Sequence, residues 1–124
     1  MKLSRERFEA LVAEALDSLP ESFVRHMLNV EVIAEAWPSA RTLRDAGVPR
    51  GETLFGLYEG IPLTERTTAY GNVLPDKITI FQGPIETACA TEADVRAEVR
   101  DTVVHEFAHF FGISDDQLRL WGVY

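Results

Sequence analysis

Residues 91–112 have the sequence TEADVRAEVRDTVVHEFAHFFG, which is the longest stretch of helical periodicity in the chain. Thr91 is a favoured N-cap residue, and Gly112 is a favoured residue for ending a helix. One arc of the helix is apolar and carries Val99, Val103, Phe107, Phe110 and Phe111. The opposite arc is polar and carries Glu98, Asp101, Thr102, His105 and His109. The pattern predicts a long helix over 91–111 that is buried along one side.

Shorter elements are expected on both sides of this helix. The sequence predicts a helix over 4–18 with Ser4 as its N-cap, and short helices over 21–27, 41–46 and 115–121. It predicts strands over 29–36, 53–58 and 77–82, the last ended by Gly83 and Pro84, and a long irregular loop over 60–75. This order predicts an α+β fold: a small twisted β-sheet with the long helix packed on it. With 124 residues, we expect 1–124 to form one domain.

The composition narrows the possible functions. The formal net charge is −8 and the sequence pI is about 4.8. This acidity argues against binding to nucleic acid or to an anionic membrane, because both depend on Lys and Arg. The single cysteine, Cys89, rules out an intrachain disulfide. Because no apolar run resembles a signal peptide or a membrane span, we expect a cytoplasmic protein of bacterial type.

The motif His105-Glu106-x-x-His109 carries the chemistry. Residues four apart on a helix lie on the same side, one turn from each other, so both imidazoles can reach one divalent ion, with zinc as the best match. Glu106 lies ~100° around the helix axis from His105, so it flanks the metal instead of binding it. There it can act as general base toward a water that the metal activates. The alternative is a helix whose two histidines are only solvated or packed.

A catalytic zinc usually has three protein ligands and one open position. Downstream of the motif the only acidic residues are Asp115 and Asp116, and no His or Cys follows. On a straight helix Asp116 would lie ~10.5 Å along the axis from His109, so the chain must turn back, and Gly112 permits such a turn. Asp115, Asp116 and the upstream His26 are the candidates for the third ligand.

The spacing His105-Glu106-x-x-His109-x-x-Gly112-x-x-Asp115 resembles the extended zinc motif of metzincin-type peptidases, with Asp in place of the final His. More closely, the chain resembles a family of small bacterial single-domain zincin-like metallopeptidases, through segments 57–66, 74–81 and 102–116. The resemblance implies a minimal zincin fold and peptidase activity. It also implies one zinc ion bound by His105, His109 and Asp115, with Glu106 as the catalytic base.

In sites of this type an extended peptide or protein substrate pairs with an edge strand. Segments 54–58 and 78–82 are the two candidates for that strand. Arg66, Tyr70 or Tyr58 could stabilise the oxyanion, although a surface ion pair or ordinary packing explains each of them more simply.

Two other functions compete with peptide hydrolysis. Metzincins place a methionine below the metal, whereas Met1 and Met27 both precede the motif, so Leu118, Leu120 and Trp121 would have to form this floor. That departure motivates a metal-stabilised protein-binding module with little or no catalysis. The third possibility is a plain α+β domain without metal, in which the long acidic helix contacts a partner. The sequence does not specify the oligomeric state.

Overall fold

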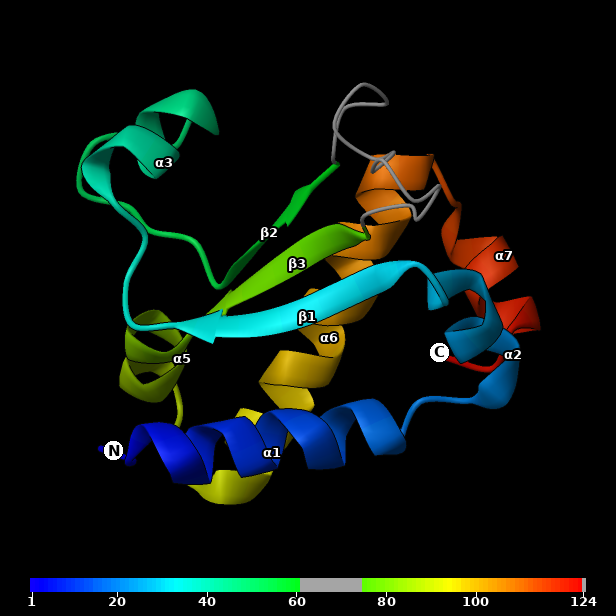
Figure 1. Ribbon diagram of the computed structural model, residues 1–124, viewed down its shortest axis with the longest axis horizontal. Helices are drawn as coiled ribbons and strands as arrows, with labels where there is room; N and C mark the ends of the chain where they lie inside the picture. Colours follow the sequence, from blue (N-terminus) through cyan, green and yellow to red (C-terminus); the bar gives the residue numbers. More distant parts are fainter. Residues whose placement is uncertain (61–74, 124) are drawn as a thin grey trace, which may run out of the picture.

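The computed structural model describes residues 1–60 and 75–123 (Figure 1). Its elements are α1 (Arg5–Asp17), α2 (Glu21–Val24), the 3-10 turn η1 (Arg25–Met27), β1 (Val30–Glu35), α3 (Ala40–Asp45), β2 (Gly56–Glu59), β3 (Asp76–Phe81), α5 (Gln82–Ala88), α6 (Glu92–Phe111) and α7 (Asp115–Leu120). No helix in these two ranges combines the length and the hydropathy needed to cross a lipid bilayer.

The three strands form one mixed sheet in the order β1-β3-β2 (Figure 1). β1 pairs with β3 in parallel, from Val30 opposite Asp76 to Glu35 opposite Phe81. β2 pairs with β3 antiparallel, and Tyr58 lies opposite Ile78. The expected α+β class, a small sheet with a long helix packed on it, is confirmed. Of the two segments considered for substrate pairing, β3 is central and β2 lies at an edge of the sheet that the described residues form.

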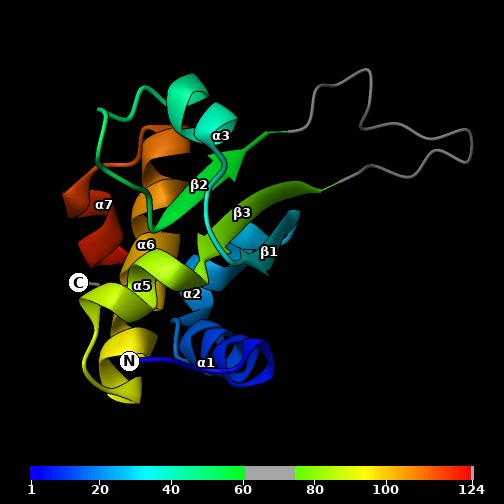
Figure 2. The same ribbon diagram turned by 90° about the vertical axis from the view of Figure 1, so that its left-hand side faces the viewer.

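Helix α6 packs against β2 and β3 and runs across the sheet (Figure 2). Thr91 forms a capping box with Asp94 at its start, and Gly112 ends it in a left-handed conformation, as the sequence predicts. A stripe at every fourth residue is fully or almost fully buried: Val95, Val99, Val103 and Phe107. Burial of each such side chain contributes about 1.5–3 kcal/mol. Phe110 and Phe111, expected on the same apolar arc, are half exposed.

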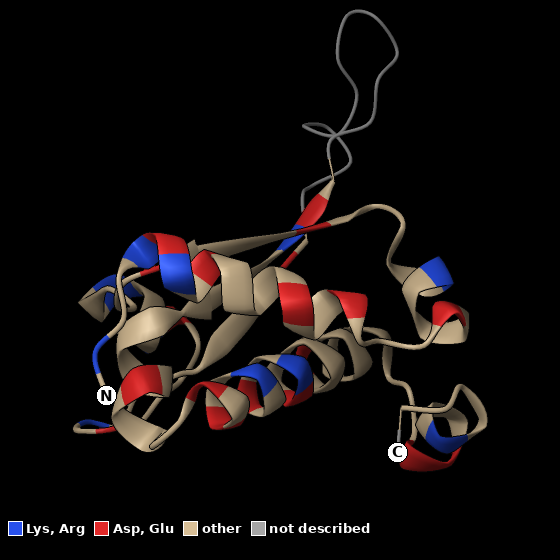
Figure 3. Cartoon of the chain, turned by 90° about the horizontal axis from the view of Figure 1, so that it is seen from below, with Lys and Arg blue, Asp and Glu red and all other residues tan. Residues whose placement is uncertain are grey.

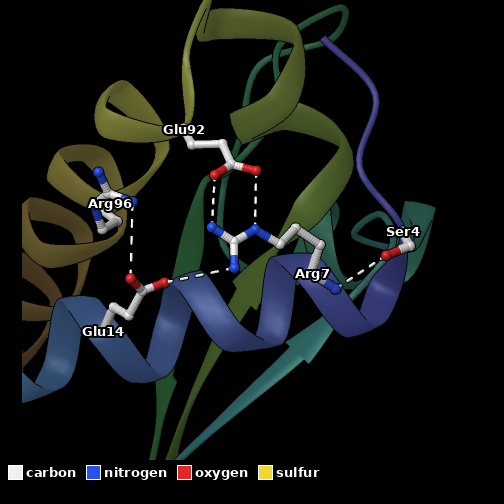
Figure 4. Close-up of polar contacts among 5 residues, drawn as sticks. All are labelled: Ser4, Arg7, Glu14, Glu92 and Arg96. Carbon is white, nitrogen blue, oxygen red and sulfur yellow. Dashed lines mark hydrogen bonds and ion pairs between the residues drawn. The ribbon is translucent and has the colours of Figure 1, made fainter.

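Helix α1 packs beside α6 and is tied to it by charged residues (Figure 4). Arg7 donates to both carboxylate oxygens of Glu92, at 2.9 and 2.6 Å. Glu14 lies between Arg7 and Arg96, with nitrogen-to-oxygen distances of 4.0 and 3.9 Å. Figure 3, a view from the α1 side, shows acidic and basic segments next to one another on this face. Glu14 and Glu92 are therefore each paired with basic residues.

Two expectations about the strands need correction. The strand expected over 53–58 begins only at Gly56, although the carbonyl of Phe55 still accepts a bond from Phe81 N–H at 2.8 Å. The sequence predicts that Gly83 and Pro84 end the strand, but β3 already ends at Phe81 and the chain passes directly into α5, whose first turn holds both residues. Proline is tolerated there because the first N–H groups of a helix have no intrahelical partner. The expected loop over 60–75 falls, except for its ends, outside the described residues.

Replacing Arg7 by Gln should destabilise the fold slightly at neutral pH and hardly at all in acid. The hydrogen bond from Arg7 is the largest cause of the lowered pKa of Glu92. A lowered folded-state pKa adds stability above the unfolded value of about 4.3, and this stability is lost as the pH falls through the folded-state pKa. Urea unfolding at neutral pH and at about pH 3 measures the effect.

Arg41→Gln is the matched control, because Arg41 pairs only with the exposed Asp45, at 3.8 Å within α3. It should change the unfolding midpoint little at either pH. A deficit of Arg7→Gln that stayed constant with pH would show that the Arg7–Glu92 pair does not link the two helices energetically.

Candidate metal centre

The two histidines of the motif lie one turn apart near the C-terminal end of α6. Both side chains are exposed, and Glu106 between them is half buried. His109 is in the last turn, where the free carbonyl groups of the helix favour positive charge. The end of α6 therefore offers two nitrogen donors at a place that suits a cation.

The chain reverses after Gly112, which adopts φ 65° and ψ 34°. Ile113 N–H donates to the carbonyl of Ala108 at 2.9 Å, a bond that closes the helix. Ser114 then caps α7, whose first turn holds Asp115 and Asp116. Acidic residues also suit a helix N-terminus, so this position alone accounts for both carboxylates.

The two carboxylates have different surroundings. Asp116 accepts a hydrogen bond from Arg119 at 2.8 Å, and its side chain is 92% exposed. Asp115 is exposed and makes no hydrogen bond or ion pair with the described residues. Of these two carboxylates, that of Asp115 is therefore the one with no side-chain partner among the described residues.

Fit to zinc can be tested on the donors that the structure brings together. Within 1–60 and 75–123, no three His, Cys, Asp or Glu side chains lie close enough to share one ion. His105 and His109 lie one helical turn apart, but the structure does not bring Asp115 together with them. The other candidate, His26, stacks on Trp121 at a centroid distance of 4.0 Å. The third ligand remains a prediction.

Glu106 is held by the edge strand. Its Oε1 accepts a hydrogen bond from the main-chain N–H of Tyr58 in β2 at 3.0 Å. Its Oε2 makes no hydrogen bond with the described residues. This contact fixes the carboxylate while leaving one oxygen available. The sequence gives no signal for this contact, because the donor is a main-chain N–H group.

Tyr58 is a packing and hydrogen-bonding residue. Its hydroxyl donates to Asp76 Oδ2 at 2.7 Å, and its ring stacks on Phe110 at 4.0 Å between centroids. These contacts support the simpler of the two roles considered for it. Arg66 and Tyr70, the other oxyanion candidates, lie outside the described residues.

The three residues expected to form a floor below the motif differ in how they pack. Leu118 is buried, and Trp121 packs against Phe23, which in turn contacts Phe107 of α6. Leu120, by contrast, is 80% exposed and belongs to no floor. Phe23, Phe107 and Trp121 therefore form an aromatic cluster that joins α2, α6 and the end of α7.

A cleft of about 670 Å³ opens beside the motif. One wall comes from α6, with Glu98, Thr102, His105 and Glu106, and the other from residues 51–56. Gly56 makes the close approach possible, since a Cβ added there would lie 2.6 Å from Thr102 Cγ2 and 3.0 Å from the carbonyl oxygen of Thr79. Neither this cleft nor its second wall could be predicted from the motif.

The chain is similar to a known protein family and to a solved structure. A family model described as zincin-like metallopeptidase matches residues 27–122. A solved structure described as a conserved hypothetical protein from Thermo thermophilus shares 27% sequence identity with the chain, with a TM-score of 0.55. That similarity covers 88% of this chain and 94% of the other. No curated protein sequence matches.

Gly56→Ala should destabilise the protein by about 1–3 kcal/mol, because the new methyl group overpacks the contact between β2 and α6. Thr102→Ser removes the methyl group that it would meet, so the double variant should be more stable than the sum of the two single effects predicts. Urea unfolding of all four proteins measures the coupling. If the effects of the two substitutions on the free energy of unfolding simply add, Gly56 and Thr102 do not determine the spacing between β2 and α6.

Proposed function

Because this chain belongs to the zincin-like metallopeptidase family, we propose that it is a zinc-dependent peptide hydrolase. One zinc ion is held by His105, His109 and Asp115, and Glu106 is the general base. The observation that carries the proposal is the position of His105 and Glu106 in the wall of a cleft of about 670 Å³, beside an edge strand.

The donor set suits zinc, since two imidazoles and one carboxylate leave a fourth position open. Zinc bound there would supply Lewis acidity, which makes hydroxide available at neutral pH and polarises a carbonyl group. Asp115 is the proposed third ligand because the chain reverses at Gly112 just before it, and it has no competing partner among the described residues. Since Asp115 does not lie beside the two imidazoles in this structure, zinc binding would have to bring it to them.

Glu106 moves the proton. Its Oε1 is held by Tyr58 N–H, so Oε2 is the atom that accepts a proton from the attacking water and passes it to the leaving amine. Holding one oxygen restricts the rotation of the carboxylate before substrate arrives, which reduces the entropy lost in the reaction.

The substrate is an extended peptide aligned with β2. This strand lies at the edge of the sheet, and its Tyr58 N–H already points to Glu106. A peptide that adds to this edge through main-chain hydrogen bonds would pass the two histidines. Side-chain specificity would then depend on the cleft walls.

One observation favours a second candidate function, a metal-stabilised protein-binding module with little or no catalysis. Among the described residues no third ligand stands beside the two imidazoles. Such a module would use the same edge strand and cleft to hold a partner without cleaving it.

Metal content tests the ligands. The natural protein should bind about one zinc ion per chain and should unfold at a higher temperature when zinc is added. His109→Ala should lose both effects. Asp115→Asn should weaken zinc binding by more than about 100-fold, since even groups that only orient a ligand are worth about 10- to 100-fold.

Asp116→Asn is the control for Asp115→Asn, because it makes the same charge change one residue away, at a carboxylate engaged by Arg119. It should leave zinc affinity unchanged. Equal affinities in the two aspartate variants would remove Asp115 from the site.

Glu106→Gln should keep zinc and lose about 10²- to 10⁴-fold in the rate of peptide cleavage. The Gln amide oxygen can still accept the bond from Tyr58 N–H, so the strand and helix should stay in place. Cleavage of a peptide library and zinc content are measured on the same samples. Undiminished cleavage would eliminate the assigned role of Glu106, and no cleavage by either protein would favour the binding module.

A further inference from the structure

The cleft beside the motif extends well beyond the histidines. It follows α6 back from Glu106 and His105 to Thr102 and Glu98, opposite residues 51–56. Its charged described lining residues, apart from His105, are all acidic: Glu52, Glu98 and Glu106. No Lys or Arg is among the described residues that line it.

Glu98 differs from Glu92, which lies nearer the N-terminus of the same helix, in having no Arg or Lys partner among the described residues. Glu92, at the start of α6, is held by Arg7. Glu98 makes no hydrogen bond or salt bridge with any described residue. Partial burial raises the pKa of its carboxyl, and the nearby Asp101 raises it further, against a smaller lowering by His105. A positive group from outside would relieve this repulsion.

Thr102 supplies a polar atom at the same place. Its side chain is more than nine-tenths buried, and its Cγ2 is the atom closest to Gly56. Its hydroxyl has no hydrogen-bond partner among the described residues, although every fully buried polar side-chain atom there has one. The hydroxyl therefore keeps some exposure, and the cleft is the space that Thr102 lines.

We propose that Glu98 and Thr102 form a subsite that binds the cationic side chain of a Lys or Arg residue in the peptide. The carboxylate of Glu98 receives the charge, and the hydroxyl of Thr102 accepts a second hydrogen bond from the same group. Substrates of this chain are therefore basic in the part that enters the cleft.

The spacing limits where the basic residue lies. Seven residues separate Glu98 from His105, which is ~10.5 Å along the helix axis. An extended peptide advances ~3.3 Å per residue, so the basic residue lies no more than about three residues from the bond beside the two histidines.

The identification of a substrate rests on the proposed hydrolysis, but the subsite is tested by binding alone. The probes are fluorescent peptides blocked at both ends, identical except for one position that holds Lys, norleucine or Glu. That position is moved through the peptide in single steps. Blocked ends ensure that only the side-chain charge differs.

In the natural protein, the Lys peptide should bind about tenfold more tightly than the norleucine peptide at its best position, and the Glu peptide more weakly still. Added salt should reduce this preference. Glu98→Gln should abolish it, and Thr102→Val, which keeps the shape, should reduce it. Glu31→Gln, which removes one charge on the exposed strand β1, should leave it intact.

Equal affinities for the Lys and norleucine peptides at every position, or an unchanged preference in Glu98→Gln, would overturn the subsite. Thermal unfolding of each variant establishes that it is folded. A Lys preference without any cleavage would reject the hydrolase and keep the subsite. Cleavage without a Lys preference would do the reverse.

Discussion

The close packing of strand β2 on helix α6 is the constraint on which the candidate site depends. Gly56 has no side chain, so the strand approaches Thr102 directly, while two residues later the ring of Tyr58 stacks on Phe110. Alternation along the strand directs both positions toward the helix. This contact places the main-chain N–H of Tyr58 within hydrogen-bond distance of Glu106 and forms one side of the cleft.

The acidic residues of α6 differ along the helix in whether a basic side chain pairs with them. At its first turn, Glu92 is neutralised by Arg7 of the neighbouring helix. Along the cleft, Glu98 and Glu106 pair with no Lys or Arg within the described residues. The proposed zinc ion and the proposed basic substrate group would both supply positive charge at this place. The net charge of −8 is therefore not spread evenly over the protein, because some acidic side chains are paired with basic ones and others are not.

Local signals predicted most of the elements, and non-local contacts explain the differences. Ser4, Thr91 and Gly112 act as helix caps because capping depends on atoms within a few residues. Helix α5 was missed because Gly83 and Pro84 usually mark turns, whereas here they lie in a first helical turn with the ring of Trp37 against Gly83. The segment before Gly56 has strand-like residues but lines the cleft instead of pairing along its length.

The sequence alone determined the pair of imidazoles, because the helical repeat fixes residues four apart on one side whatever surrounds them. It also determined the reversal after Gly112, since only a residue without Cβ readily takes φ 65°. Only the tertiary structure decided that β2 is the edge strand, that Tyr58 N–H holds Glu106, and that Glu98 and Thr102 share a cleft. The contact between Tyr58 and Glu106 joins residues 48 positions apart. Such distances depend on how whole elements pack rather than on any local repeat.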